Sequence, residues 1–146
     1  MKKFAYLLVI LMLAALHKTA FGQENQDNWP WVYMSEFQVP WSRIDSLMKL
    51  ENITDKEWNW YEKAKEMGHI IDFRFMLHHT GDEWNVRYEW VYPSWEAMNK
   101  SDWMKEVSEA VEPDSTKRKP INEGYQWVFK DVTHRDQIYR LVIGAR

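Results

Sequence analysis

Apolar and polar residues alternate along three short stretches of the chain, a pattern typical of strands that bury one face. In residues 31–39 the apolar side chains of one face are aromatic or branched: Trp31, Tyr33, Phe37 and Val39. Residues 71–77 and 84–92 alternate in the same way, and Thr80-Gly81-Asp82 between them is suited to a turn. We therefore predict a strand that ends at Pro40, followed later in the chain by a hairpin.

Helical spacing of apolar residues separates these strands. The segment 42–68 repeats apolar residues at helical spacing, with a break at Asn52 and a second start at the capping-box sequence 54–57, and it ends at Gly68, a residue that favours helix C-termini. The segment 94–112 does the same, with Ser94 as a candidate N-cap and Pro113 as its stop. These two patterns predict two helical segments, one before the hairpin and one after it.

The last part of the domain is predicted to add a strand to the sheet. Residues 114–122 are highly charged and are expected to form a loop, and the alternation of Tyr125, Trp127 and Phe129 after Gly124 predicts a fourth strand. Residues 137–143 are either a short fifth strand or a tail. The predicted order is β-α-β-β-α-β, an α+β fold of the ferredoxin-like type, with two helical segments on one face of an antiparallel sheet.

The start of the chain is typical of a signal for export. Lys2 and Lys3 precede an apolar run of 13 residues, Phe4–Leu16, and small residues stand at Ala20 and Gly22. The run is too short for a membrane-spanning helix, which needs about 20 residues. We predict a signal peptide at 1–22, a flexible lead-in at 23–30, a single domain at 31–146, and a periplasmic or secreted protein.

Charge and cysteine content exclude several classes of function. Loss of residues 1–22 removes three lysines and no acid, so the formal net charge falls from −3 to −6. An acidic domain lacks the clustered cations that nucleic acids and anionic lipids attract, so we expect no nucleic-acid partner and no membrane contact after cleavage. The chain has no cysteine, which excludes disulfides and thiolate chemistry.

Alternation places charges of both signs on the sheet face opposite the aromatic rows. The residues predicted for this face include Gln126, Val128 and Lys130 from the fourth strand. One interpretation is a solvated face whose charges pair across strands. The other is that two such faces meet in a homodimer and enclose a polar cavity for a small molecule.

Five residues of this face are the candidate ligand-pocket residues. Arg74 and Arg87 could hold an anionic group through bidentate hydrogen bonds. Glu36 or Glu89 could act as a base if burial raised its pKa. His78 could carry a proton near neutral pH. No motif assigns a catalytic residue, so the question of enzymatic activity stays open.

No metal site and no cofactor are predicted. His78 and His79 are adjacent in a predicted strand, where neighbouring side chains point to opposite faces and cannot bind one ion. The pattern Asn-x-Ser/Thr occurs at Asn52 and Asn99, but it matters only in a host that glycosylates exported proteins.

The order of elements resembles a known superfamily. A strand that ends in Pro40, a helical segment that ends at Gly68, and a hairpin that runs into the sequence Tyr92–Met98 are similar to the dimeric α/β-barrel superfamily, which includes antibiotic-biosynthesis-type monooxygenases. The resemblance covers most of residues 31–130. It implies a homodimer formed through the sheet and a small-molecule site, and it makes cofactor-independent monooxygenase activity one alternative.

Two further interpretations of the sequence stay open. Ten tryptophans in an exported protein are compatible with carbohydrate binding by exposed rings, and the least committed to the core are Trp29, Trp41, Trp60, Trp95 and Trp103. Core filling explains the remaining rings, because aromatic side chains bury large areas. The other interpretation is a structural envelope protein with a solvated sheet face.

Overall fold

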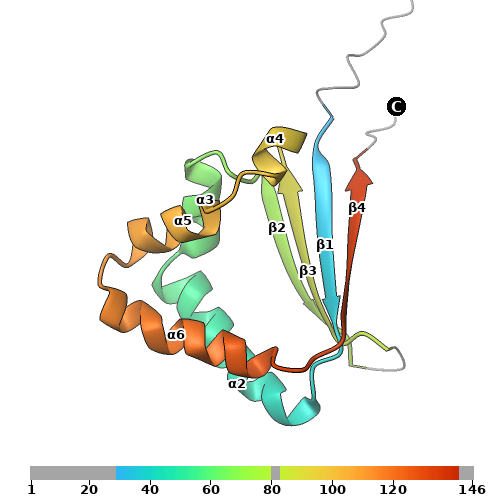
Figure 1. Cartoon of the computed structure of the whole chain (residues 1–146), viewed down its shortest axis with the longest axis vertical. Coiled ribbons are helices and arrows are strands. Elements are labelled where there is room, and N and C mark those ends of the chain that lie inside the picture. Colours follow the sequence, from blue (N-terminus) through green and yellow to red (C-terminus); the bar gives the residue numbers. More distant parts are fainter. Residues whose placement is uncertain (1–28, 80–82, 142–146) are drawn as a thin grey trace, which may run out of the picture.

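The computed structural model describes residues 29–79 and 83–141. Its four strands form one antiparallel sheet, and the helices lie together on one face of it (Figure 1). The predicted signal peptide at 1–22, nearly all of the lead-in at 23–30 and the turn at 80–82 lie outside the described residues. Within the described residues, no helix combines the length and the apolar character that a membrane span requires.

Ten elements make up the described chain. In order they are β1 (Trp31–Phe37), α2 (Trp41–Asn52), the π-helical turn η2 (Ile53–Glu57), α3 (Trp60–Glu66), β2 (Asp72–Leu77), β3 (Val86–Tyr92), α4 (Trp95–Met98), α5 (Trp103–Val111), α6 (Ser115–Val128) and β4 (His134–Arg140).

The strands lie in the order β2-β3-β1-β4, and each neighbouring pair is antiparallel. Strand β1 is therefore central and contacts both β3, from the hairpin, and the carboxyl-terminal β4. Together with the sequence of elements, this order defines a ferredoxin-like α+β fold and confirms the predicted fold class.

The carboxyl-terminal prediction was wrong in its details. Residues 114–122, predicted to be a loop, and residues 125–129, predicted to be a strand, instead form helix α6 together with its caps, Asp114 and Phe129. The fourth strand of the sheet is β4, which overlaps the segment left open as a fifth strand or a tail. Of the residues predicted for the second sheet face, Gln126, Val128 and Lys130 are therefore not on the sheet.

The prediction failed because the apolar residues of this short segment fit both the two-residue period of a strand and the 3.6-residue period of a helix. Read at helical spacing, Ile121, Tyr125 and Val128 form one stripe, and this stripe packs against the core. Asp114 caps the helix by accepting a hydrogen bond from the backbone N–H of Thr116 at 2.8 Å. Burial of that stripe against the sheet outweighs the strand-like alternation of three aromatic residues.

Two clusters of buried side chains join the helices to the sheet. One lies between α2, α6 and the hairpin and includes Leu47, Val86 and Val128. The other lies under α3 and α5 and includes Tyr92 and Val107. The aromatic rows of β1, β2 and β3 pack against these clusters, so the prediction of which sheet face the helices cover is confirmed for those strands.

Local signals at helix ends were read partly correctly. Gly68 adopts a φ of 75° just after α3, and the Ser94 hydroxyl caps α4 by accepting a hydrogen bond from the backbone N–H of Ala97. The first helical segment is interrupted by η2 and by Asn59, whose φ of 54° is left-handed. This break turns the chain between α2 and α3, and the residues on either side of Asn59 line a pocket described below.

Candidate functional site

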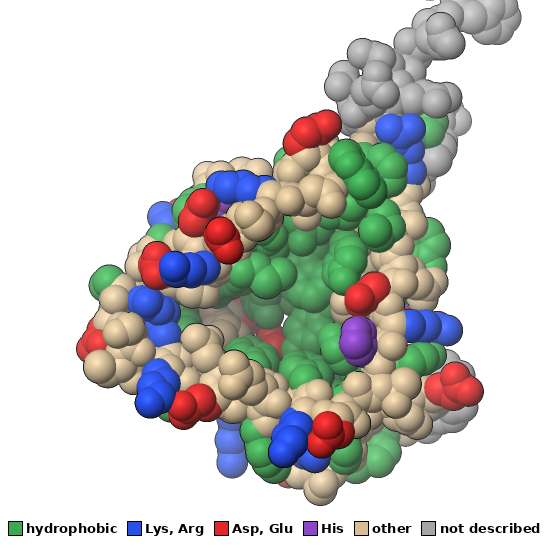
Figure 2. Space-filling view, viewed as in Figure 1, with side chains coloured by type: hydrophobic (Ala, Val, Ile, Leu, Met, Phe, Trp, Pro, Cys, Tyr) green, Lys and Arg blue, Asp and Glu red, His purple; other side chains and the backbone are tan. Residues whose placement is uncertain are grey.

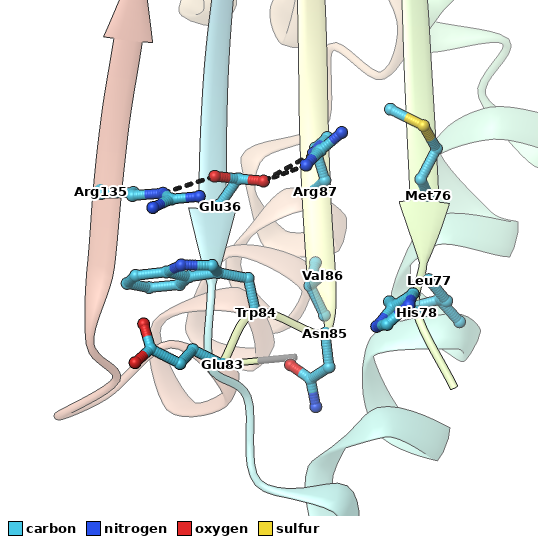
Figure 3. A pocket seen from close by; sticks show the side chains of 10 residues that line it. All are labelled: Glu36, Met76, Leu77, His78, Glu83, Trp84, Asn85, Val86, Arg87 and Arg135. Atoms are coloured by element: carbon cyan, nitrogen blue, oxygen red, sulfur yellow. Dashed lines mark hydrogen bonds and ion pairs between the residues drawn. The ribbon is translucent and has the colours of Figure 1, made fainter. Parts of the chain in front are cut away.

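The open face of the sheet, which the helices leave uncovered, centres on Glu36. The Glu36 carboxylate accepts a hydrogen bond of 2.8 Å from Arg87 Nε and one of 2.6 Å from Arg135 Nε (Figure 3). It also accepts one of 2.9 Å from the Gln137 amide. The three donors come from strands β3 and β4, which flank β1 and place these residues opposite or nearly opposite Glu36.

Glu36 is only 1% exposed although none of the described helices covers it. Burial acts to raise its pKa, but the hydrogen bonds and charges of Arg135 and Arg87 outweigh burial and hold the pKa below its ordinary value. The carboxylate therefore stays ionised and fully paired. Such a group is unsuited to act as a base, which is one of the roles that the sequence suggested for Glu36.

A pocket of about 650 Å³, the open-face pocket, lies beside this cluster. Its lining includes Glu36, Arg87 and His78 (Figure 3). Trp84 was predicted to face the core, yet its ring lies 4.9 Å from the Arg135 guanidinium in this pocket. Strand β3 begins only at Val86, so the alternation of the strand does not extend back to Trp84.

The five candidate residues do not form one site. Glu36, Arg87 and His78 line the open-face pocket, whereas Arg74 and Glu89 form a separate ion pair at 3.1 Å and are not part of its lining. The separation follows from register, because Arg74 pairs with Glu89, and Glu89 pairs with Met34, two residues before Glu36 on β1. The ligand-binding roles of all five remain predictions.

A second pocket, the inner pocket, lies between the helices and the covered face of the sheet and has a volume of about 360 Å³. The space-filling view shows the molecule hollowed between its helical and sheet layers, with apolar side chains inside (Figure 2). Aromatic rings dominate its lining: Phe37, Trp58, Trp60, Tyr61, Tyr88, Trp90, Tyr125 and Phe129. Ligand pockets in proteins are commonly of this size and apolar character.

One acid, Glu51 of α2, lines the inner pocket and is 5% exposed. Three tyrosine hydroxyls from three different elements donate to its carboxylate. Tyr88 donates to Oε1 at 2.5 Å, Tyr125 donates to Oε1 at 3.0 Å, and Tyr61 donates to Oε2 at 2.6 Å. We refer to these four residues as the Glu51 cluster.

Burial is the main influence on the ionisation of this cluster. It raises the pKa of Glu51, and the three hydroxyl donors only partly oppose that effect. Burial and the neighbouring carboxyl also raise the pKa of Tyr61, Tyr88 and Tyr125, so the phenols stay protonated. The lining of the inner pocket thus includes a carboxyl group that can gain or lose a proton.

The break in the first helical segment shapes the pocket wall. Trp58 and Trp60 flank the left-handed residue Asn59, and both rings line the inner pocket. The Trp60 indole N–H donates to the Ser108 hydroxyl of α5 at 2.9 Å, which fixes that ring across the pocket. π-Helical turns and left-handed residues are uncommon and recur at functional sites.

Sequence reasoning missed the Glu51 cluster. Tyr61 lies in the segment 42–68 that was predicted to be helical and Tyr88 in the predicted strand 84–92, whereas Tyr125 was assigned to a fourth strand. A signal was present, because Glu51 follows Leu47 by four residues and so interrupts the apolar stripe of its helix with an acid. The partners of that acid come from elements far apart in the sequence, so their meeting could not be read from spacing.

Two other predictions concern metals and tryptophans. In residues 29–79 and 83–141, no group of three or more His, Asp or Glu side chains could hold a metal ion. Among the tryptophans considered for carbohydrate binding, Trp41 and Trp95 are about half exposed, whereas Trp103 is buried. Trp41 stacks on His79 and Trp95 packs on Trp31, so these two rings have different neighbours.

Fold and site together define the class of this protein as a ferredoxin-like α+β protein with an aromatic pocket between its helices and its sheet. No protein-family model and no curated protein matches the chain. Solved structures similar to it include a dimeric ferredoxin-like protein from an uncultured marine organism, at 12% identity and a TM-score of 0.46, covering 80% of this chain and 97% of that one.

Two further solved structures are similar in the same way. One is a NIPSNAP-like domain protein from Burkholderia xenovorans, at 8% identity and a TM-score of 0.48, covering 82% of this chain and 90% of that one. The other is a candidate monooxygenase from Shewanella loihica PV-4, at 12% identity and a TM-score of 0.35, covering 80% of this chain and 97% of that one. These likenesses assign no activity to this chain.

Proposed function

We propose that the protein binds a small, largely apolar molecule in the inner pocket. The observation that carries the proposal is the pocket itself, which has a volume of about 360 Å³, mostly aromatic walls and one acid, Glu51. An apolar molecule that enters it removes its own surface and that of the rings from water, which favours binding.

The inner pocket is better suited to bind a ligand than the open-face pocket. On the open face the charged groups already satisfy each other, since Glu36 accepts hydrogen bonds from Arg87, Arg135 and Gln137. A ligand there would have to replace those bonds. In the inner pocket the walls are apolar rings, and an apolar ligand displaces only water from them.

Binding is tested with Nile red, a neutral dye that fluoresces in apolar surroundings. We expect saturable binding to the intact protein and loss of most of that binding in the variant Asn122→Phe, because Asn122 lines the inner pocket and is exposed on α6. The measurement is dye fluorescence as a function of protein concentration.

The matched control is Glu123→Phe, which adds the same ring one position along α6, where the side chain is exposed and lines none of the pockets described. Equal loss of dye binding in both variants would mean that the ring acts through the helix and not through the pocket. Unchanged binding in both would overturn the proposal.

We also propose that two copies of the chain associate through the open face. The face presents both signs of charge side by side, in the pair Arg74–Glu89 and in the group around Glu36. A face of this kind can be complementary to a copy of itself across a two-fold axis. Export to the periplasm or medium is likewise part of the proposal and is supported by the sequence of residues 1–22.

A further inference from the structure

The inner pocket surrounds an acidic group with aromatic rings. Eight of its lining side chains are aromatic, and Glu51 is the one acid in the described lining. Among the described residues, the lining of the pocket includes no lysine, arginine or histidine. The pocket therefore offers negative potential from two sources, the carboxylate and the faces of the rings.

The hydrogen-bond partners of Glu51 place no positive charge beside it. The groups bonded to it are neutral hydroxyls, which satisfy acceptor positions without adding positive charge. Glu36 on the open face is the contrasting case, since two guanidinium groups neutralise it. A carboxylate has about four acceptor positions, so a fourth donor can be accommodated at Glu51.

We propose that the ligand of the inner pocket is an organic cation, an ammonium group carried on an apolar body. The inference rests on the proposed function and adds the charge of the ligand to it. An ammonium group is attracted by aromatic faces within about 6 Å and by an uncompensated carboxylate, and both are found at one end of this pocket. The apolar body would lie against the remaining rings.

The charged groups on the other side of Glu51 do not cancel this attraction. Glu51 and Tyr61 also line an outer pocket of about 400 Å³, where acids and bases are equal in number apart from Glu51 itself: Asp55, Glu62, Lys56 and Lys65. Asp55 acts to raise the pKa of Glu51. The titratable groups that contact the Glu51 carboxyl directly from α3, β3 and α6 are the three tyrosines, which stay neutral.

The test uses three probes with one six-carbon chain and different charge: hexyltrimethylammonium, hexan-1-ol and hexanoate. Binding is measured at neutral pH by isothermal titration calorimetry with the full chain. We expect the cation to bind about tenfold or more tighter than the alcohol, and hexanoate to bind weakest. The quaternary ammonium group does not titrate, so its charge is constant across pH.

The variant Glu51→Gln keeps a polar group in the same place and removes its charge. We expect the preference for the cation over hexan-1-ol to disappear while the alcohol still binds. If the alcohol binds as tightly as the cation to the native protein, or if the preference survives in Glu51→Gln, the cation inference fails and the proposed function stands. If none of the three probes binds, both fail.

A second measurement does not depend on the folding of that variant. Because Glu51 must be ionised to attract the cation, affinity for hexyltrimethylammonium should rise with pH through the pKa of Glu51. The Tyr61 hydroxyl lowers that pKa, so Tyr61→Phe should move the rise to higher pH. An affinity for the cation that is independent of pH in both proteins, or the same midpoint in both, would overturn the inference.

Discussion

Glu36 and Glu51 are both nearly inaccessible to solvent, and they illustrate two ways of burying a carboxyl group. Glu36 is paired with Arg87 and Arg135, which favour its ionised form. Glu51 is bonded to three tyrosine hydroxyls, and burial shifts it toward its protonated form. Because a pKa that differs between the folded and unfolded states makes stability depend on pH, the two residues should have opposite effects.

For Glu51 the pKa in the folded state lies above the ordinary value of 4.5. Between these two values the folded protein binds more protons than the unfolded chain, so the free energy of unfolding decreases as pH rises above 4.5. In Glu51→Gln this decrease should be absent. The measurement is urea unfolding of both proteins at a series of pH values above 4.5.

Glu36 supplies the internal comparison. Its folded pKa lies below 4.5, so its contribution to stability is present above that pH and is lost as pH falls through the folded value. In the native protein, protonation of Glu36 should lower the free energy of unfolding as pH falls below 4.5. In Glu36→Gln this decrease should be absent, and the change of the free energy of unfolding above pH 4.5 should stay as in the native protein. The same pH dependence in both variants would contradict the assignment of the two carboxyls.

At the scale of elements, the contact between α2 and α6 determines where the Glu51 cluster forms. Gly124 of α6 faces Leu50 of α2, and a Cβ atom at residue 124 would lie 2.8 Å from Leu50 Cδ2. This close approach brings Tyr125 within reach of both Glu51 and Thr54. Gly124, which was predicted to precede a strand, thus permits two helices to pack closely.

A larger side chain at residue 124 should push the two helices apart. We expect Gly124→Val to lower the free energy of unfolding by about 1–3 kcal/mol, the usual cost of overpacking a buried contact. Glycine has a lower helix propensity than valine, so helix propensity cannot account for such a loss. Gln126→Val, at an exposed position of the same helix, is the control for a valine in α6 that does not meet Leu50. Urea unfolding of the two variants gives the comparison, and equal losses would mean that the Leu50 contact is unimportant.

At the scale of the whole molecule, the helices cover one face of the sheet and leave the other open (Figure 1). The proposed ligand and the proposed second copy therefore use different faces of one sheet. The inner pocket lies within one chain, and the open face carries the paired charges around Glu36. Binding of the ligand does not require the dimer, so the two proposals can be tested separately.

Native mass spectrometry of protein purified from its own host tests the dimer and export together. For the native protein we expect a dimer of chains that begin at Gln23. For the variant Met76→Glu we expect a monomer. Met76 lies opposite Arg87 on the open face, and a new charge buried there would disfavour association. Met67→Glu, at an exposed residue that follows α3, is the matched control. A native monomer, or a Met76→Glu dimer, would contradict the sheet-face dimer, and retention of Met1 would contradict export.

Much of the fold could be predicted from local patterns. The alternation in β1, β2 and β3 and the ends of the helices at Gly68 and Ser94 were interpreted correctly, because a strand with one buried face or a helix cap leaves its mark within a few residues. The segment 114–129 was interpreted wrongly, because its aromatic residues fit the spacing of a strand and of a helix equally well. Only the core against which Val128 packs distinguishes the two.

The sequence by itself determined the α+β class and the sheet face that the helices cover, since burial of the aromatic rows permits one orientation of each strand. The tertiary structure alone decided which strand is fourth and where the Glu51 cluster lies. The cluster joins α2, α3, β3 and α6, and its hydrogen bonds span up to 74 positions in the chain. Contacts between such distant residues depend on how the elements pack, and no local period records them.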